Sequence, residues 1–191
     1  MSILSENSIT QTRLPKQAIA ATLVGSLIIT ASAQVQLPLP LGVPVTLQTL
    51  AILGIAMIMG PSIGLSSVIL YLAEAACGLP VLAGFKNGLL GFSGPTGGYL
   101  VGFIFTALIA GILAKNGFQK SRLKVFLAGG LALTPTYLIG LWWLQKFTVS
   151  WEVAYTSGVA PFLFGEVLKL FFLALLVPSA CKLTKAASQK P

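Results

Sequence analysis

The sequence predicts an all-α integral membrane protein with six transmembrane helices, irregular outer loops that cap a ligand pocket, and both termini in the cytoplasm. Composition is the first reason: 55% of the 191 residues are hydrophobic, only 8% are charged, and the mean hydropathy is +0.91. Soluble domains carry about 25% charged residues. Since a spanning helix needs about 20 residues, the apolar runs amount to six spans with short loops. No length remains for a separate soluble domain.

The chain divides into a short polar cytoplasmic N-terminus (1–15), one six-helix membrane domain (16–182) and a basic cytoplasmic tail (183–191). The first span covers about 17–36. Two basic residues before an apolar run that reaches Ala-Ser-Ala also resemble a secretory signal peptide with its cleavage site. The run is long for a signal peptide and further spans follow, so we expect a retained helix.

A proline-rich segment, 37–44, follows the first span and reads Leu-Pro-Leu-Pro-Leu-Gly-Val-Pro. Three prolines and a glycine remove amide donors and favour extended backbone, so this segment is not helical. It has no charge. We expect a loop that lies against the membrane-embedded protein, where irregular backbone persists only if it is buried or lines a cavity.

The second and third spans cover 46–59 and 62–77, and Gly60-Pro61 joins them. So short a connection makes the two helices antiparallel neighbours. Glu74, near the end of the third span, is either a site residue or a carboxylate near the interface that contacts solvent.

A glycine-rich segment, 78–98, contains seven glycines and two prolines. Loops of this length are usually functional or disordered, and the aliphatic and aromatic content argues against disorder. Glycines let the backbone approach a ligand closely. The segment is therefore a candidate part of a binding site, although a plain re-entrant cap fits it too. It supplies Lys86, Asn87, Ser93 and Thr96 as side-chain partners, and Tyr99 follows it directly.

The fourth, fifth and sixth spans cover about 97–114, 124–144 and 161–177. Aromatic residues gather around the connection between the last two, as in an interfacial belt. With six spans both termini share one side, which would hold nine basic residues, whereas the other side would hold Lys86 and Lys146. The excess of basic residues assigns both termini to the cytoplasm. The nine are Arg13, Lys16, Lys115, Lys120, Arg122, Lys124, Lys182, Lys185 and Lys190.

Glu166 and Lys169 lie inside the sixth span, three residues apart and so on one helix face. An ionisable residue at the bilayer centre costs roughly 2.5 to 3.5 kcal/mol, which makes the pair a functional-site hypothesis. The alternative is an ion pair that only neutralises itself or stays wet near the interface. The proline-rich segment, the glycine-rich segment and the aromatic connection would then face outward. The pair would lie beneath these three loops, about two turns in from the outer end, in a pocket that opens outward.

Such a pocket suits a small amphipathic ligand with an apolar body and a carboxylate. Lys169 or Lys86 can hold the carboxylate, while Glu166 and Asn87 can bind a polar, amide-like head. The sequence has no nucleotide-binding loop, no histidine, no Gly-x-Ser-x-Gly and no clustered carboxylates. We therefore predict no catalytic residue, no cofactor and no metal, and the basic residues indicate topology rather than nucleic-acid binding.

Four segments, in order over roughly 17–180, carry a resemblance to a known family. They are Leu-Pro-Leu-Pro-Leu-Gly-Val-Pro-Val-Thr-Leu-Gln (37–48), Gly-Leu-Pro-Val (78–81), Gly-Pro-Thr-Gly-Gly-Tyr (94–99) and the acid-x-x-Lys of Glu166 and Lys169. The chain resembles the BioY family of biotin transporters, the substrate-binding S components of energy-coupling-factor transporters. The resemblance implies high-affinity biotin capture at the outer face of a prokaryotic cytoplasmic membrane and delivery into the cell.

The resemblance also implies site residues and partners. Asn87, Glu166 and Lys169 would be the main polar contacts of biotin, followed by Thr46, Gln48 and Tyr99. The charge of Lys169 assigns it to the biotin carboxylate, with Lys86 as a competitor. The family's acidic residue is often Asp, so Glu166 changes the head-group geometry. The partners would be membrane lipid, a transmembrane coupling protein and two ATPase subunits that supply the energy.

Small residues on the first span, Ala18, Ala21 and Gly25, are candidates for docking the coupling protein. Small residues four apart, here Ala18 and Thr22 or Ala21 and Gly25, let helices approach closely. Internal packing explains the same spacing. Two other functions stay open. One is a self-sufficient secondary transporter that uses Glu166 as a proton carrier, and the other is an S component for another small vitamin with a carboxylate.

Overall fold

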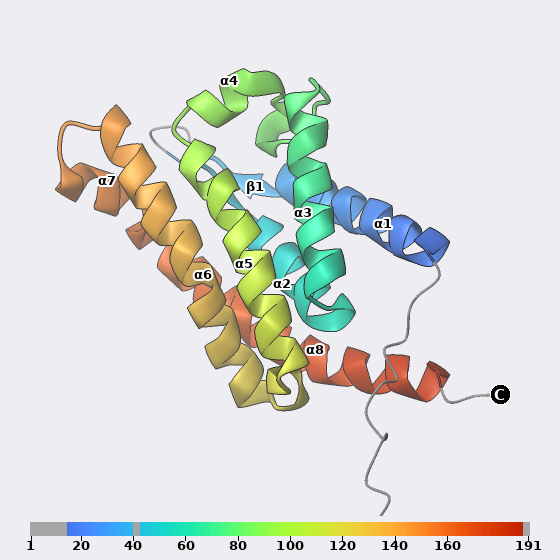
Figure 1. Cartoon of the computed structure of the whole chain (residues 1–191). Helices are drawn as coiled ribbons and strands as arrows, with labels where there is room; N and C mark the ends of the chain where they lie inside the picture. The colour runs from blue at the N-terminus through green and yellow to red at the C-terminus, as the bar shows by residue number, and fades with distance from the viewer. Residues whose placement is uncertain (1–14, 40–42, 189–191) are drawn as a thin grey trace, which may run out of the picture.

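A computed structural model describes residues 15–39 and 43–188 of the chain (Figure 1). Most of the predicted N-terminal segment 1–15, the centre of the proline-rich segment and the last three residues of the predicted tail lie outside the described residues.

Helices of 12 to 29 residues occupy all six segments predicted as spans. They are α1 (Pro15–Gln34), α2 (Gln48–Met59), α3 (Pro61–Ala76), α5 (Gly97–Lys115), α6 (Arg122–Leu144) and α8 (Ala160–Ser188). Short elements lie between them: the helices α4 (Gly88–Ser93) and α7 (Trp151–Gly158), and the 3₁₀ turns η2 (Ala83–Phe85), η3 (Phe118–Lys120) and η4 (Gln145–Phe147). Strands β1 (Gln36–Leu37) and β2 (Val45–Thr46) form a two-stranded antiparallel ribbon in which Gln36 pairs with Thr46.

Four of the described helical stretches are long and apolar enough to cross a membrane: Lys16–Gln34, Gly97–Lys115, Arg122–Phe147 and Trp151–Lys182. Helices α2 and α3 are apolar but shorter, with 12 and 16 residues. The chain is therefore a multi-pass membrane protein, as the composition predicts.

Three segments are more helical than the sequence suggested. The last helix continues past 177 to Ser188 and contains Pro178, which removes only one amide donor from the helix. The glycine-rich segment includes η2 and α4, so it is not wholly irregular. The aromatic connection contains η4 and α7, and the Ser150 hydroxyl caps α7 by accepting a hydrogen bond from the Val153 amide at 3.2 Å.

Small residues let the helices pack closely. Between α5 and α6, which run side by side in Figure 1, a Cβ on Gly102 would lie 2.4 Å from the Thr136 Cα. Between α2 and α3, a Cβ on Gly64 would lie 2.7 Å from the Ala56 Cα. Such close approach is how helices associate in a bilayer, where apolar burial supplies little drive. The backbone positions around the site are fixed by this packing.

Helix α1 is the least buried of the long apolar helices and runs at a steep angle to α3 (Figure 1). The short helices α4 and α7 and strand β1 lie at one end of the bundle. The α2–α3 junction and the α5–α6 connection lie at the other end (Figure 1). The described parts of the three loop regions expected to meet at one end therefore do so.

Candidate functional site

A cavity lies among β2, the first turn of α2, the segment that follows α3, and helices α5, α6 and α8. We call residues 78–96 the cap segment, because they close this cavity at the α4 end of the bundle. The open space, including the part that reaches solvent, is about 680 Å³.

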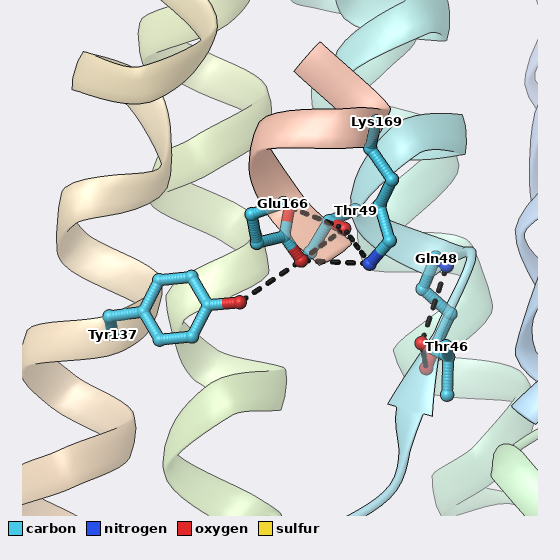
Figure 2. Close-up of polar contacts among 6 residues, drawn as sticks. All are labelled: Thr46, Gln48, Thr49, Tyr137, Glu166 and Lys169. Atoms are coloured by element: carbon cyan, nitrogen blue, oxygen red, sulfur yellow. Dashed lines mark hydrogen bonds and ion pairs between the residues drawn. The ribbon is translucent and has the colours of Figure 1, made fainter. Parts of the chain in front are cut away.

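Four side chains, which we call the polar cluster, form one wall of the cavity: Thr49, Tyr137, Glu166 and Lys169 (Figure 2). The predicted pair does share one face of α8. The Lys169 ammonium lies 2.8 Å from Glu166 Oε1, and the two residues are only 7% and 5% exposed. Because both charges are buried, each must be compensated within the protein.

Two hydroxyl groups complete the compensation of the Glu166 carboxylate. The Tyr137 hydroxyl donates to Oε1 at 3.0 Å, and the Thr49 hydroxyl donates to Oε1 and Oε2 at 2.9 and 3.1 Å. The Lys169 ammonium also donates to Thr49 Oγ1 at 3.0 Å. Helices α2, α6 and α8 thus meet at a single carboxylate.

Among the described residues, the Glu166 carboxylate and the Lys169 ammonium each keep one hydrogen-bonding position without a protein partner. Glu166 Oε1 accepts from three groups, whereas Oε2 receives only a share of the Thr49 hydroxyl. Lys169 has three N–H donors, and two of them are engaged. The cluster therefore offers a ligand one carboxylate oxygen and one ammonium N–H, side by side.

An aromatic wall stands next to the polar cluster. The rings of Tyr99, Tyr137 and Phe162 lie 6.0 to 6.3 Å apart, centroid to centroid. The Tyr99 hydroxyl donates to the Gly158 carbonyl at 2.8 Å, and a Cβ on Gly140 would lie 2.5 Å from the Tyr99 ring. The hydroxyl of Tyr99 therefore serves the fold, and its fixed ring offers apolar surface to a ligand.

Thr46 and Gln48 are buried at the cavity and bond to each other. The Thr46 hydroxyl donates to Gln48 Oε1 at 2.9 Å and accepts from the backbone N–H of Gln48 at 3.3 Å. The side-chain Nε2 of Gln48 donates to the Tyr71 hydroxyl at 2.9 Å. These contacts fix the start of α2, and so the position of Thr49. The second Nε2 hydrogen of Gln48 has no partner among the described residues, which makes Gln48 the stronger ligand candidate of the two.

The structure brings together most of the side chains that the sequence nominated. Glu166, Lys169, Tyr99, Gln48, Thr46 and Lys86 all line the cavity. Asn87 is exposed and is not among the lining residues. Its contact with a ligand stays a prediction.

Sequence reasoning missed Thr49, Tyr137 and Phe162 as site residues. Phe162 stands four residues before Glu166 on α8, so helix spacing could have nominated it. Thr49 directly follows Gln48, and Tyr137 is a phenol inside an apolar helix, but their partners lie 117 and 29 residues away along the chain.

Two other nominated features lie elsewhere. Glu74 is half-buried between helices, accepts a hydrogen bond from the Ser26 hydroxyl, and does not line the cavity. Gly25 faces α3, because a Cβ there would lie 2.2 Å from Ser67 Oγ, while Ala18 and Ala21 are half-buried. Docking of a partner at these small residues stays a prediction. In the described part of the chain no group of three His, Cys, Asp or Glu could hold a metal ion.

Comparisons with known proteins agree with this architecture. The sequence model of the BioY family matches residues 6–186. A probable biotin transporter BioY of Pyrococcus horikoshii is 36% identical over 149 residues, which is 78% of this chain and 87% of that protein. The biotin transporter BioY of Thermotoga maritima is 38% identical over 140 residues, 72% and 81% of the two chains.

A solved structure shares the fold. It is the crystal structure of the S-component for biotin from an ECF-type ABC transporter, with a TM-score of 0.78 and 26% sequence identity. The similarity covers 93% of this chain and 95% of that one.

Proposed function

Because the chain belongs to the BioY family, we propose that it binds biotin in the cavity and serves as the substrate-binding subunit of a biotin uptake system in the cell membrane. The chain is a transporter component rather than an enzyme, since the relatives described above are named as transporters. The observation that carries the choice of ligand is the adjacent acceptor and donor on Glu166 and Lys169.

The ureido head of biotin matches these two positions. A urea presents N–H donors beside a carbonyl acceptor. Its N–H would donate to Glu166 Oε2 and its oxygen would accept from the free N–H of Lys169. Hydrogen bonds to charged groups are about twice as strong as neutral ones. The aromatic wall of Tyr99, Tyr137 and Phe162 would then cover the thiophane ring.

The valerate carboxylate would lie at Lys86. The charge of Lys169 is already balanced by Glu166, and the two form the only ion pair among the side chains that the structure describes. Lys86 lines the same cavity, is exposed, and has no acidic partner within the described residues. A carboxylate in partial contact with water keeps some of its hydration and still meets a cation. This geometry favours Lys86 over Lys169, the residue that charge alone suggested.

We further propose six spans with both termini in the cytoplasm. Helix α2 is about 18 Å long. The ribbon that precedes it would fill the remaining depth, as non-helical backbone can when it lines a cavity. The exposed basic residues of the α5–α6 connection lie at the end opposite α4 and α7 (Figure 1). The positive-inside rule then assigns that end to the cytoplasm.

The partners would be those of an S component: a transmembrane coupling protein and two ATPase subunits. The neighbouring crystal structure is described as part of an ECF-type ABC transporter, which supports this assembly. Helix α1 is the least buried of the long apolar helices, so we propose that it docks the coupling protein through its exposed face, beside the half-buried Ala18 and Ala21. Gly25 itself is buried against Ser67 of α3 and lets these two helices pack closely. The remaining exposed apolar surface would contact lipid.

Calorimetric titration of the full chain, purified in detergent, tests the function. We expect saturable binding of biotin, and we expect Lys169→Ala to lose most of the affinity, while Lys115→Ala, which removes an exposed cation far from the cavity, leaves it unchanged. Equal affinity of Lys169→Ala and the parent chain would refute the assigned role. Another carboxylate-bearing vitamin that displaced biotin with higher affinity would change the substrate, and proton-driven uptake by the chain alone in liposomes would favour a secondary transporter.

A further inference from the structure

One side chain at the end of α1 bonds to the cap segment through both of its polar atoms. Gln34 is the last residue of α1. Its Nε2 donates to the carbonyls of Val81 and Leu82 at 3.3 and 3.1 Å and to the Thr30 carbonyl of its own helix at 3.3 Å. Its Oε1 accepts from the backbone amide of Phe85 at 3.2 Å. A donor and an acceptor on one amide group thus connect residues four apart in the cap segment.

The residues that Gln34 holds belong to the cavity wall. Leu82 is 4% exposed and lines the cavity together with Ala83 and Lys86. The Leu82 amide donates to the Lys86 carbonyl at 3.1 Å, which closes the turn. Any change in the anchorage of this turn therefore moves three side chains of the cavity.

The turn is strained. Gly84 has a φ of 71° and Phe85 a φ of 57°. The left-handed region costs a residue with a Cβ roughly 1 to 2 kcal/mol, and such conformations persist only where the surroundings enforce them. The Phe85 side chain is 69% exposed, so burial of its ring does not compensate the strain. The hydrogen bond from its amide to Gln34 is the contact that acts at the strained residue itself.

We propose that Gln34 is a positioning residue that holds the cap segment closed over the cavity and thereby sets how fast a ligand enters and leaves. Without the Gln34 amide, the Phe85 backbone relaxes out of the left-handed region and the turn that presents Leu82, Ala83 and Lys86 opens. Gln34 holds the cap segment closed in the ligand-free chain, so the closure does not depend on which ligand binds. Only the identity of the ligand rests on the proposed function.

Hydrogen exchange of the purified, ligand-free chain tests the closure directly. We expect Gln34→Ala to raise the exchange rate of the Leu82 and Phe85 amides about tenfold or more, as the loss of two to three hydrogen bonds implies. Unchanged exchange in the interior of α5 verifies that the variant is folded. Ser32→Ala is the matched control, because Ser32 also lies on α1 but donates only within the helix, to the Ile28 carbonyl. Equal exchange at the two cap amides in Gln34→Ala and Ser32→Ala would overturn the proposal.

A second variant separates the two halves of the contact. Gln34→Glu keeps an acceptor for the Phe85 amide but turns a carboxylate oxygen toward two carbonyls, so we expect faster exchange at Leu82 than at Phe85. Stopped-flow measurements should show biotin entering and leaving Gln34→Ala faster than Ser32→Ala. Altered exchange in a chain that binds no biotin would leave the closure standing and refute the proposed function. Unaltered exchange in a chain that does bind biotin would refute the closure alone.

Discussion

Removing the cation of the polar cluster should damage stability and binding in separable ways. Lys169→Met keeps a side chain of similar length and volume but leaves the Glu166 carboxylate, 5% exposed, with hydroxyl donors only. Breaking a buried ion pair by removing one partner costs about 3 to 5 kcal/mol, because the other charge stays buried. We expect the free energy of unfolding to fall by about that amount, measured by chemical denaturation in detergent micelles.

The double variant Glu166→Gln/Lys169→Met is the matched control. Its introduced amide has no charge to compensate and can still accept hydrogen bonds from Thr49 and Tyr137, so most of the lost stability should return, since neutral replacements of buried pairs are often tolerated. Biotin affinity, measured by calorimetry, should not return, because the carboxylate oxygen and the ammonium N–H that match a urea are both gone. A single variant as stable as the parent chain, or a double variant with restored affinity, would refute this account of the cluster.

Three further outcomes follow from the cavity. Lys86→Ala should weaken biotin binding about tenfold, as the loss of a charged hydrogen bond implies, but should leave the affinity for biotin amide unchanged. Equal losses for both ligands would show that the biotin carboxylate does not bind Lys86. Gly140→Ala should destabilise the chain by about 1 to 3 kcal/mol in the same denaturation assay, since its Cβ would lie 2.5 Å from the Tyr99 ring; a neutral effect would mean that the ring is not fixed. Gly91→Ala should push Leu82, whose Cδ1 would lie 2.4 Å from the new Cβ, toward the cavity and weaken biotin binding; unchanged affinity would show that Leu82 moves away from the ligand instead.

Local spacing in the sequence was enough to predict the helices and the Glu166–Lys169 pair. Each of the six apolar runs forms a helix, because hydropathy and Gly-Pro boundaries are local signals, although only four of the described helical stretches are long enough to cross a membrane. The extent of the last helix was not predictable in this way. A proline usually marks the end of a helix, but Pro178 lies within α8.

The remaining wall of the site depends on contacts that no local pattern contains. Tyr137 on α6 donates to Glu166 on α8, 29 residues away along the chain, and the neighbouring Thr136 packs against Gly102 of α5. In the cap segment, Lys86 lines the cavity and Asn87 does not. The left-handed backbone at Phe85 precedes both residues and helps to set which of them faces inward. A phenylalanine rarely adopts this conformation, so the sequence gives no signal for it.

The most direct test of the central claim is a structure of the chain with biotin bound. We predict the ureido oxygen within hydrogen-bonding distance of Lys169 Nζ, a ureido N–H directed at Glu166 Oε2, and the valerate carboxylate at Lys86. A carboxylate seated on Lys169, or biotin bound outside the cavity, would contradict the account.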